Sequence, residues 1–329
     1  MKFAYFLTTG LLLTGSFIKA QTSTSRLDTF FSRLVEDQKI NGNVLVAEKG
    51  TVIYQQSFGF ADFARQEPNT KKTRFNFASV SKPFTATAIF QLIEKRKLKL
   101  DNRLVDYLQD FPYDSITIRH LLSHTSGLPD IEELFTPLLK KDPAHVVINR
   151  DIIPQLEQLH KPLHFPPGQQ YEYSNINYCL LALLIERVSN TAYPGYLEKY
   201  IFKPAGMKNT LLQTAENLAQ DKPLEAKRYI KAYPYREMSE DVTALPEFRK
   251  WTYNWAGLIG QGNIISTMED MLLFDHALYA NKLISGASFK LMCTPVRLNN
   301  EQYPISGQGL IGRPTGWAGL FLRTQQLVK

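Results

Sequence analysis

The sequence has few of the residues that metal centres and disulfide scaffolds need. It holds two cysteines and six scattered histidines among 329 residues, and none of them form a group with zinc-ligand spacing. A glycine motif that cradles phosphate is also lacking, which argues against a nucleotide enzyme. We therefore expect no metal and no cofactor. Cys179 lies within Tyr178–Leu184, a predicted buried helix, so we expect Cys179 and Cys293 to be free, buried thiols, with a disulfide as the alternative.

Apolar runs long enough to cross a bilayer are absent from the sequence. The run from Phe3 to Leu13 is too short, because a span needs about 20 apolar residues. It follows Met1-Lys2 and leads through small and polar residues to Ala20, an order typical of a secretory signal peptide. We predict a signal peptide over residues 1–20, a mature chain with no stable membrane span, and export to the periplasm or the extracellular space.

Charge of one sign is not concentrated anywhere in the chain. The formal net charge is +7, and Lys2 and Lys19 lie in the predicted signal peptide, which leaves +5 for residues 21–329. The densest basic run, Glu94–Lys97, is short, and no basic stripe with interleaved aromatic residues follows it. We read the charge as a solvated surface and expect no nucleic-acid partner. The hydrophobic content of 44% indicates a packed globule.

Hydrophobic periodicity orders the chain as strands first, helices in the middle and strand-like sequence towards the end. Lys49-Gly50 separates two alternating runs and predicts a β-hairpin, while residues 58–78 look irregular. Ser266–Glu269 predicts a capping box before the last helix. The expected helices are 25–38, 79–96, 180–188 and 271–279, and the expected strands are 43–48 and 51–56.

This order predicts an α+β fold in one domain, residues 21–329, in which the chain leaves a sheet and returns to it. The sheet lobe would hold residues 25–78 and 300–329, and the helical lobe residues 79–299.

Ser79 and Lys82 are the first candidate for catalysis. A spacing of three places both side chains on one helix face, where a lysine could activate the serine if its pKa is lowered. The spacing alone is weak evidence, because it also occurs at Ser16 and Lys19, inside the predicted signal peptide. An ordinary helix start with serine capping is the alternative.

Tyr173 and Asn175 are the second candidate. They follow the turn Pro166–Gly168, and two residues so spaced on a loop can both face one cleft. Tyr173 could pass a proton to a leaving group, and Asn175 could hydrogen-bond a substrate amide. The alternative is a loop aromatic packed on the surface.

Taken together, five segments resemble the class C β-lactamase-like serine hydrolases, which include D-alanyl-D-alanine carboxypeptidases and related esterases. Within these segments HTSGLP (124–129) and YSN (173–175) are fairly specific markers of the group. The resemblance covers about residues 27–300. The segments occur in the family's order, over residues 77–101, 116–130, 165–186, 201–210 and 260–285.

The resemblance implies a β-lactamase/transpeptidase-like fold, with an antiparallel sheet lobe packed with helices, a mostly helical lobe and an active-site cleft between them. It implies Ser79 as the acylated nucleophile, Lys82 as the base and Tyr173 as general acid and base. Asn175 would contact substrate, and the Ser79 backbone N–H would serve as one oxyanion donor. His124 and Ser126 look like a structural turn, because no nucleophile-elbow motif surrounds Ser126.

The C-terminal part departs from the family, which carries a cation followed by Thr/Ser-Gly on the strand beside the cleft. The best match is Thr315-Gly316, followed by Trp317, and we assign these three residues to substrate binding. Pro314 stands in the cation's place, and it donates no backbone hydrogen bond. Because the family usually continues beyond this point with further strands and a helix, we expect a truncated sheet, from a truncated or frameshifted chain. The alternatives are a fold completed by a partner chain and a reduced variant of the C-terminal region.

These observations predict an exported serine hydrolase that forms an acyl-enzyme on an amide or ester. The candidate substrates are a D-Ala peptide of peptidoglycan, a β-lactam or a small ester. The alternative, motivated by Pro314, is an impaired or non-catalytic relative that binds peptidoglycan fragments or a protein partner. The sequence leaves the oligomeric state open.

Overall fold

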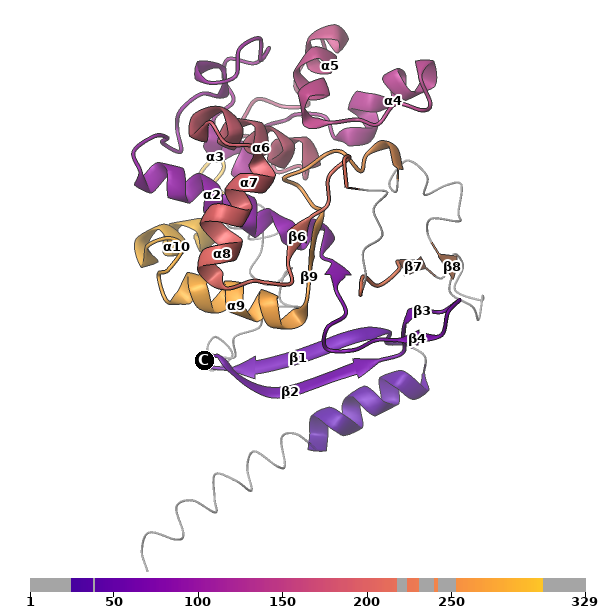
Figure 1. Ribbon diagram of the computed structural model, residues 1–329. Coiled ribbons are helices and arrows are strands. Elements are labelled where there is room, and N and C mark those ends of the chain that lie inside the picture. The colour runs from indigo at the N-terminus through magenta and orange to yellow at the C-terminus, as the bar shows by residue number, and fades with distance from the viewer. Residues whose placement is uncertain (1–24, 38, 218–223, 231–239, 242–252, 304–329) are drawn as a thin grey trace, which may run out of the picture. The chain divides into compact units, whose positions relative to one another are not determined.

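The computed structural model describes residues 25–37, 39–217, 224–230, 240–241 and 253–303. These residues form two compact units (Figure 1). The first unit holds the described residues up to Thr73 together with Leu224–Ala226, and the second holds the remainder. The predicted signal peptide and the segment Pro314–Trp317 lie outside the described residues.

The first unit contains a helix over residues 25–36 and the hairpin of β1 (Gly42–Glu48) and β2 (Thr51–Phe58). Glu48 pairs with Thr51, which leaves a two-residue turn. Its residues Lys49 and Gly50 both have positive φ, 51° and 83°, the combination that suits the twist of a tight hairpin. The predicted helix and hairpin are confirmed.

Aromatic side chains hold the helix of residues 25–36 on the hairpin. Phe31 stacks on Tyr54 and Phe58, with ring centroids 5.2 and 6.0 Å apart. The expectation that residues 58–78 are irregular is wrong, because three short strands fall there. They are β3 (Phe60–Asp62) paired with β4 (Glu67–Pro68), and β5 (Phe75–Asn76) in the second unit.

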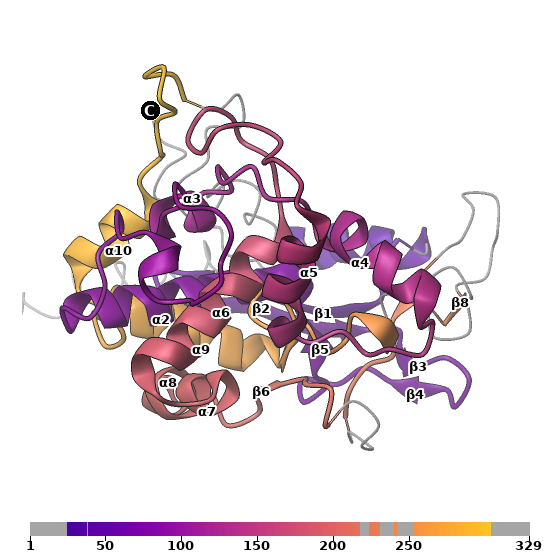
Figure 2. The same ribbon diagram turned by 90° about the horizontal axis from the view of Figure 1, so that it is seen from above.

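The second unit is mostly helical and is organised around two buried helices, α2 (Lys82–Glu94) and α6 (Asn175–Ser189), which lie side by side (Figures 1 and 2). Apolar side chains on all sides of both helices are buried, as expected for helices enclosed by others. The other helices are α3 (Ile118–Leu122), α4 (Ile131–Lys141), α5 (Ile152–Leu159), α7 (Tyr193–Leu197), α8 (Lys203–Ala205), α9 (Met268–Tyr279) and α10 (Gly286–Cys293).

Short turns and strands complete the second unit. A three-stranded antiparallel sheet has the order β5-β9-β6, with β9 (Ile264–Ser266) between β5 and β6 (Leu211–Leu212). The pair β7 (Tyr229–Ile230) and β8 (Glu240–Asp241) is separate. Single-turn helices occur at η1 (Ala78–Ser81), η2 (Leu104–Asp106), η3 (Asn149–Asp151) and η4 (Glu198–Phe202).

Local sequence explains where the central helices begin and end. Pro83 occupies the first turn of α2, where its missing N–H has no helical partner to lose. Asn190 ends α6 in the left-handed conformation that favours asparagine and glycine. The predicted cap of α9 is one residue out: Thr267, not Ser266, caps the helix by accepting from the Asp270 N–H, and Ser266 belongs to β9.

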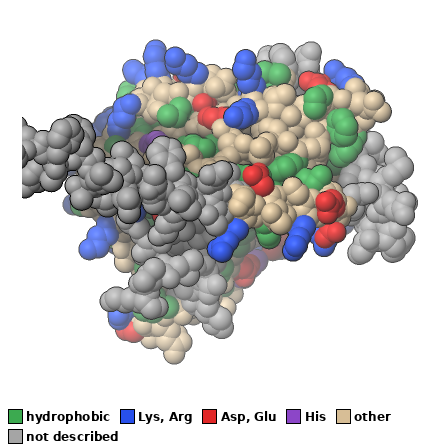
Figure 3. Space-filling model, turned by 90° about the horizontal axis from the view of Figure 1, so that it is seen from below, with side chains coloured by type: hydrophobic (Ala, Val, Ile, Leu, Met, Phe, Trp, Pro, Cys, Tyr) green, Lys and Arg blue, Asp and Glu red, His purple; other side chains and the backbone are tan. Residues whose placement is uncertain are grey.

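Both cysteines are free, as predicted. Cys179 is fully buried in α6, but Cys293 at the end of α10 is partly exposed, so the expectation of two buried thiols is wrong for Cys293. Within the described ranges, no helix combines the length and apolarity that a membrane span requires. On the face drawn in Figure 3, Lys and Arg side chains are scattered among Asp and Glu.

Candidate active site

The turn η1 carries Ser79 and is fastened to strand β9 at both ends. The Phe77 N–H donates to the Ile264 carbonyl at 2.8 Å, and the Ile264 N–H donates to Ser81 Oγ at 3.0 Å. Ala78, just before the serine, has φ of 44°, in the left-handed region, and its N–H donates to Asn76 Oδ1 of β5 at 2.8 Å. Ser79 therefore sits on a firmly held turn where α2 begins.

Lys82 is enclosed by three hydrogen-bond partners. Its Nζ lies 3.2 Å from Ser79 Oγ, 2.8 Å from Asn175 Oδ1 and 2.9 Å from the Gln261 carbonyl oxygen, and the residue is 1% exposed. A neutral amine has two N–H groups and one lone pair. Because the amide and peptide oxygens only accept, they take the two N–H groups, and the lone pair is left facing Ser79 Oγ. The predicted pairing of Ser79 with Lys82 is thus found in space.

Burial decides the charge of Lys82. It lowers the pKa of the amine to about 7, while the neighbouring Cys179 and Asp130 act in the opposite direction without outweighing it. The nearby His124 ring adds no charge, because burial first and Lys82 second lower its pKa to about 3. A substantial fraction of Lys82 is therefore a neutral amine near pH 7, as a base must be.

Tyr173 contacts both Ser79 and Lys82. Its hydroxyl is 2.7 Å from Ser79 Oγ, and Lys82 Nζ lies 4.8 Å from the centre of its ring. Although 40% of the residue is exposed, burial raises the pKa of this phenol to about 12, against the lowering effect of the Ser79 hydrogen bond. The phenol is therefore protonated at neutral pH and is placed to donate.

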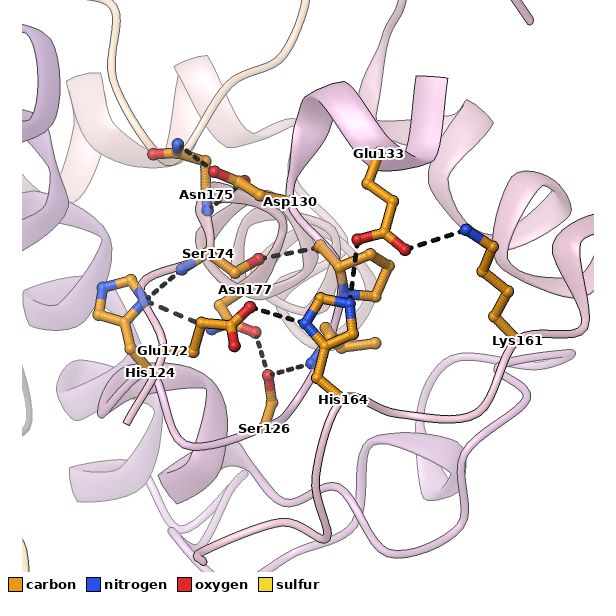
Figure 4. Close-up of polar contacts among 12 residues, drawn as sticks. His124, Ser126, Asp130, Glu133, Lys161, His164, Glu172, Ser174, Asn175 and Asn177 are labelled. Carbon is orange, nitrogen blue, oxygen red and sulfur yellow. Dashed lines mark hydrogen bonds and ion pairs between the residues drawn. The ribbon is translucent and has the colours of Figure 1, made fainter. Parts of the chain in front are cut away.

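Asn175 is the first residue of α6 and not a loop residue, which corrects the expected position (Figure 4). Its Oδ1 accepts from Lys82, its Nδ2 donates to Asp130 Oδ2 at 3.1 Å, and its backbone N–H donates to Asp130 Oδ1 at 2.7 Å. The side chain is thus held between Lys82 and the Asp130 carboxylate. Its contact with substrate stays a prediction.

Sequence reasoning missed Asp130 and Gln261. Asp130 ends the ITIRHLLSHTSGLPD segment and precedes the apolar pattern of α4, so a polar residue there reads as an ordinary helix cap. Gln261 contributes through its backbone carbonyl, which leaves no side-chain signal in a sequence. The contact joins residues 179 positions apart.

His124 and Ser126 form a buried turn, in agreement with the structural interpretation (Figure 4). His124 has φ of 56°, and its Nδ1 accepts from the Ser174 N–H at 3.3 Å. Ser126 Oγ donates to Asn177 Oδ1 at 2.7 Å, and Asn177 Nδ2 lies 3.3 Å from His124 Nδ1. Both polar side chains are used to hold the start of α6.

The predicted substrate-binding residues Thr315, Gly316 and Trp317 lie outside the described residues, and their assignment stays a prediction. The described residues contain no group of three or more His, Cys, Asp or Glu side chains arranged to hold a metal ion.

Comparison with known proteins identifies clear relatives. The Beta-lactamase family model matches residues 27–318. Penicillin-binding protein 4* of Bacillus subtilis (strain 168) is 35% identical over 312 residues, 91% of this chain and 68% of that protein. The D-aminopeptidase of Brucella anthropi is 36% identical over 190 residues, 57% of this chain and 36% of that protein. The chain thus spans only part of the length of both relatives.

A solved structure extends the similarity to the fold. The crystal structure of penicillin binding protein from Bacillus halodurans is 31% identical to this chain, with a TM-score of 0.67, and the match covers 84% of this chain and 81% of that one.

Proposed function

The chain belongs to the β-lactamase family of serine hydrolases, and from that premise we propose that it hydrolyses an amide or ester through a covalent acyl-enzyme on Ser79. One observation supports this most strongly. Lys82 is buried, its pKa is lowered to about 7, and both of its neutral N–H groups have acceptors other than Ser79. Its lone pair therefore faces the hydroxyl that must lose a proton.

The three side chains divide the proton transfers. Lys82 takes the proton from Ser79 Oγ as that oxygen bonds to the substrate carbonyl carbon. Tyr173, protonated at neutral pH, donates to the departing nitrogen or oxygen as the bond to the carbonyl carbon breaks. It then recovers a proton from protonated Lys82, which returns to the neutral amine. Water then attacks the acyl group by the reverse route, which releases the acid and restores Ser79.

The substrate class rests on the relatives. Two of them are named a penicillin-binding protein and a D-aminopeptidase. We therefore favour a D-amino-acid peptide derived from peptidoglycan, with β-lactams and small esters as further acyl donors.

Labelling with a fluorescent penicillin or a fluorophosphonate tests the acyl-enzyme. We expect one adduct, which peptide mass spectrometry locates on Ser79, and no adduct on Ser79→Ala. The control is Ser115→Ala, an exposed serine on the loop before α3. Absence of label on the native protein, or equal label on Ser79→Ala, would contradict the proposal and favour a non-catalytic, binding role.

Export is proposed on the order of residues 1–20 alone. N-terminal sequencing of the protein recovered outside the cytoplasm should begin at Gln21. Recovery only from the cytoplasm, with residues 1–20 retained, would contradict it.

A further inference from the structure

We propose that Asp130 is a positioning residue for the base: it holds the Asn175 amide so that the amide oxygen faces Lys82 and the lysine lone pair faces Ser79. The inference rests on the proposed function, since it assigns a role within the same acylation step. Both hydrogen bonds of Asp130 at this site go to Asn175, which in turn accepts from Lys82, so Asp130 acts on the base through Asn175.

Both oxygens of Asp130 are used on one residue. Oδ1 accepts from the backbone N–H of Asn175 at 2.7 Å, and Oδ2 accepts from Nδ2 of the same residue at 3.1 Å (Figure 4). The two ends of a side-chain amide have almost the same shape, so hydrogen-bond partners decide which way it points. A carboxylate accepts only, and it therefore draws Nδ2 to itself and leaves Oδ1 for Lys82.

The orientation of that amide determines where the lysine lone pair points. In the observed orientation, Asn175 Oδ1 and the Gln261 carbonyl take the two N–H groups of neutral Lys82. In the flipped orientation, Nδ2 would face Lys82 Nζ, and its N–H would attract the lone pair away from Ser79 Oγ. Asp130 excludes that arrangement, because the flip would also place Asn175 Oδ1 against a carboxylate oxygen.

The surrounding chain is arranged for this contact. Asp130 occupies the N-cap position of α4, yet its side chain makes no capping hydrogen bond there and binds the first residue of α6 instead. Ser174, the N-cap of α6, likewise makes no capping bond and donates to the Pro129 carbonyl at 3.1 Å. The side chains of Asp130 and Ser174 therefore join the turn before α4 to the start of α6, and neither of them caps its own helix.

The carboxylate also affects the base through its charge. Asp130 raises the pKa of Lys82, in opposition to the larger lowering effect of burial. The other ionisable groups around Lys82 are the phenols of Tyr173 and Tyr178, the Cys179 thiol and the His124 ring. At neutral pH these four are uncharged, because burial raises the pKa of both phenols and of the thiol and lowers that of the ring.

The test compares Asp130→Asn with the native protein in acylation by a fluorescent penicillin between pH 5 and 9. The variant side chain has the shape of the native one, but its amide NH2 group faces one of the two N–H donors of Asn175. We expect a fall in the maximal rate on the order of 10- to 100-fold, because small misplacements of a reacting group cost up to about 10²-fold. We also expect the acid limb of the profile to move to lower pH, since Lys82 loses a charge that raises its pKa.

Glu132→Gln is the matched control. Glu132 is exposed in the first turn of α4, so the variant removes the same charge from the same turn with no contact to Asn175. We expect this variant to keep the native acylation rate and the native pH profile. A native rate and a native pH profile for Asp130→Asn would overturn the inference. A lower rate would overturn it too if the acid limb stays in place and a smaller fraction of the protein is labelled, because that combination indicates partial unfolding.

A second measurement separates this inference from the proposed function. Carbon-13 NMR of the lysine Cε groups follows the titration of Lys82 without any substrate. We expect its midpoint to fall in Asp130→Asn and to stay in Glu132→Gln. If native protein takes no label, the proposed function fails, whereas an unmoved Lys82 midpoint in Asp130→Asn contradicts the positioning role.

Discussion

At the scale of single residues, the charge of Lys82 follows from what surrounds it. The side chain is 1% exposed, and its hydrogen-bond acceptors are a hydroxyl, an amide oxygen and a peptide oxygen, all neutral. A buried ammonium without a directly bonded carboxylate is unfavourable, so the group gives up its proton more readily. Burial rather than a nearby cation therefore lowers the pKa of Lys82.

The acylation rate should consequently rise with pH through about 7, the pKa of Lys82. Below that value the amine is protonated and cannot take the Ser79 proton; above it the amine is neutral, and the rate levels off. No alkaline fall is expected before about pH 10, because the phenol of Tyr173 keeps its proton to about 12. Stopped-flow labelling from about pH 5 to about pH 10 measures the profile.

Two substitutions sharpen that prediction. Lys82→Met should lower acylation by at least about 10²-fold, the usual contribution of a positioned base. Lys99→Met, which removes an exposed lysine, should leave the profile unchanged. A native rate that is flat from pH 5 to 9 would argue against Lys82 as the base.

At the scale of elements, a histidine joins α4 to the loop before α6 (Figure 4). His164 Nδ1 lies 2.7 Å from Glu172 Oε1, and Nε2 lies 3.0 Å from Glu133 Oε2. Lys161 Nζ is 3.1 Å from the other oxygen of Glu133. Only the protonated ring donates from both nitrogens, so this cluster favours the charged form. Glu172 immediately precedes Tyr173, which ties the cluster to the site.

The cluster predicts a pH-dependent contribution to stability. Burial opposes the charge of His164, but Glu172 and Glu133 outweigh it and raise its pKa above the ordinary value of 6.5. The contribution is therefore complete below pH 6.5 and is lost as pH rises through the folded-state pKa. His164→Gln should lower the melting temperature at pH 5.5 by about 2–4 °C, for roughly 1 kcal/mol, because a partly exposed cluster is screened by solvent.

Melting curves of native protein and His164→Gln at several pH values measure this effect. The difference between them should shrink by pH 8.5. Glu172→Gln should reduce the pH dependence in the same way, since it removes one of the two carboxylates. A difference that stays constant or grows with pH would contradict the assigned role.

Elements differed in how well the sequence predicted them. The hairpin and the helices around Ser79 and Met271 were predictable, because a turn dipeptide or a regular apolar period marks each. The helix α9 nevertheless begins at Met268, three residues before the predicted start. The two-residue strand β5 has no room for a period, and it exists because β9 pairs with it. The start of α6 was placed five residues late, since polar Asn175 and Asn177 conceal a helical turn that the turn around His124 holds in place.

At the scale of the whole molecule, the site is assembled from distant parts of the second unit. Tyr173 and Asn175 lie more than ninety positions from their partners at Ser79 and Lys82, and Gln261 lies 179 from Lys82. Family motifs indicated the first four residues. The Gln261 carbonyl could not be found in this way, because any residue type supplies a carbonyl and only the path of the backbone places it.

Gly260 determines the path of the backbone that places the Gln261 carbonyl. Its φ is +99°, and a Cβ there would lie 2.4 Å from the Tyr178 carbonyl oxygen and 2.7 Å from Ala182 Cβ, both on α6. The close approach brings the next carbonyl, that of Gln261, to Lys82. The fit of this segment against α6 thus couples core packing to the position of the base, and no other residue type fits the space.

Gly260→Ala should therefore harm both stability and acylation. We expect a loss of about 2–5 kcal/mol in the free energy of unfolding, from left-handed backbone strain together with overpacking. Gly206→Ala is the matched control: its φ of +85° brings a similar strain, but nothing lies within 4 Å of its Cβ. It should cost about 1 kcal/mol and leave the acylation rate of folded protein unchanged. Urea unfolding and penicillin labelling measure the two effects; equal losses in both variants, or native labelling of Gly260→Ala, would show that close packing at Gly260 does not position the Gln261 carbonyl.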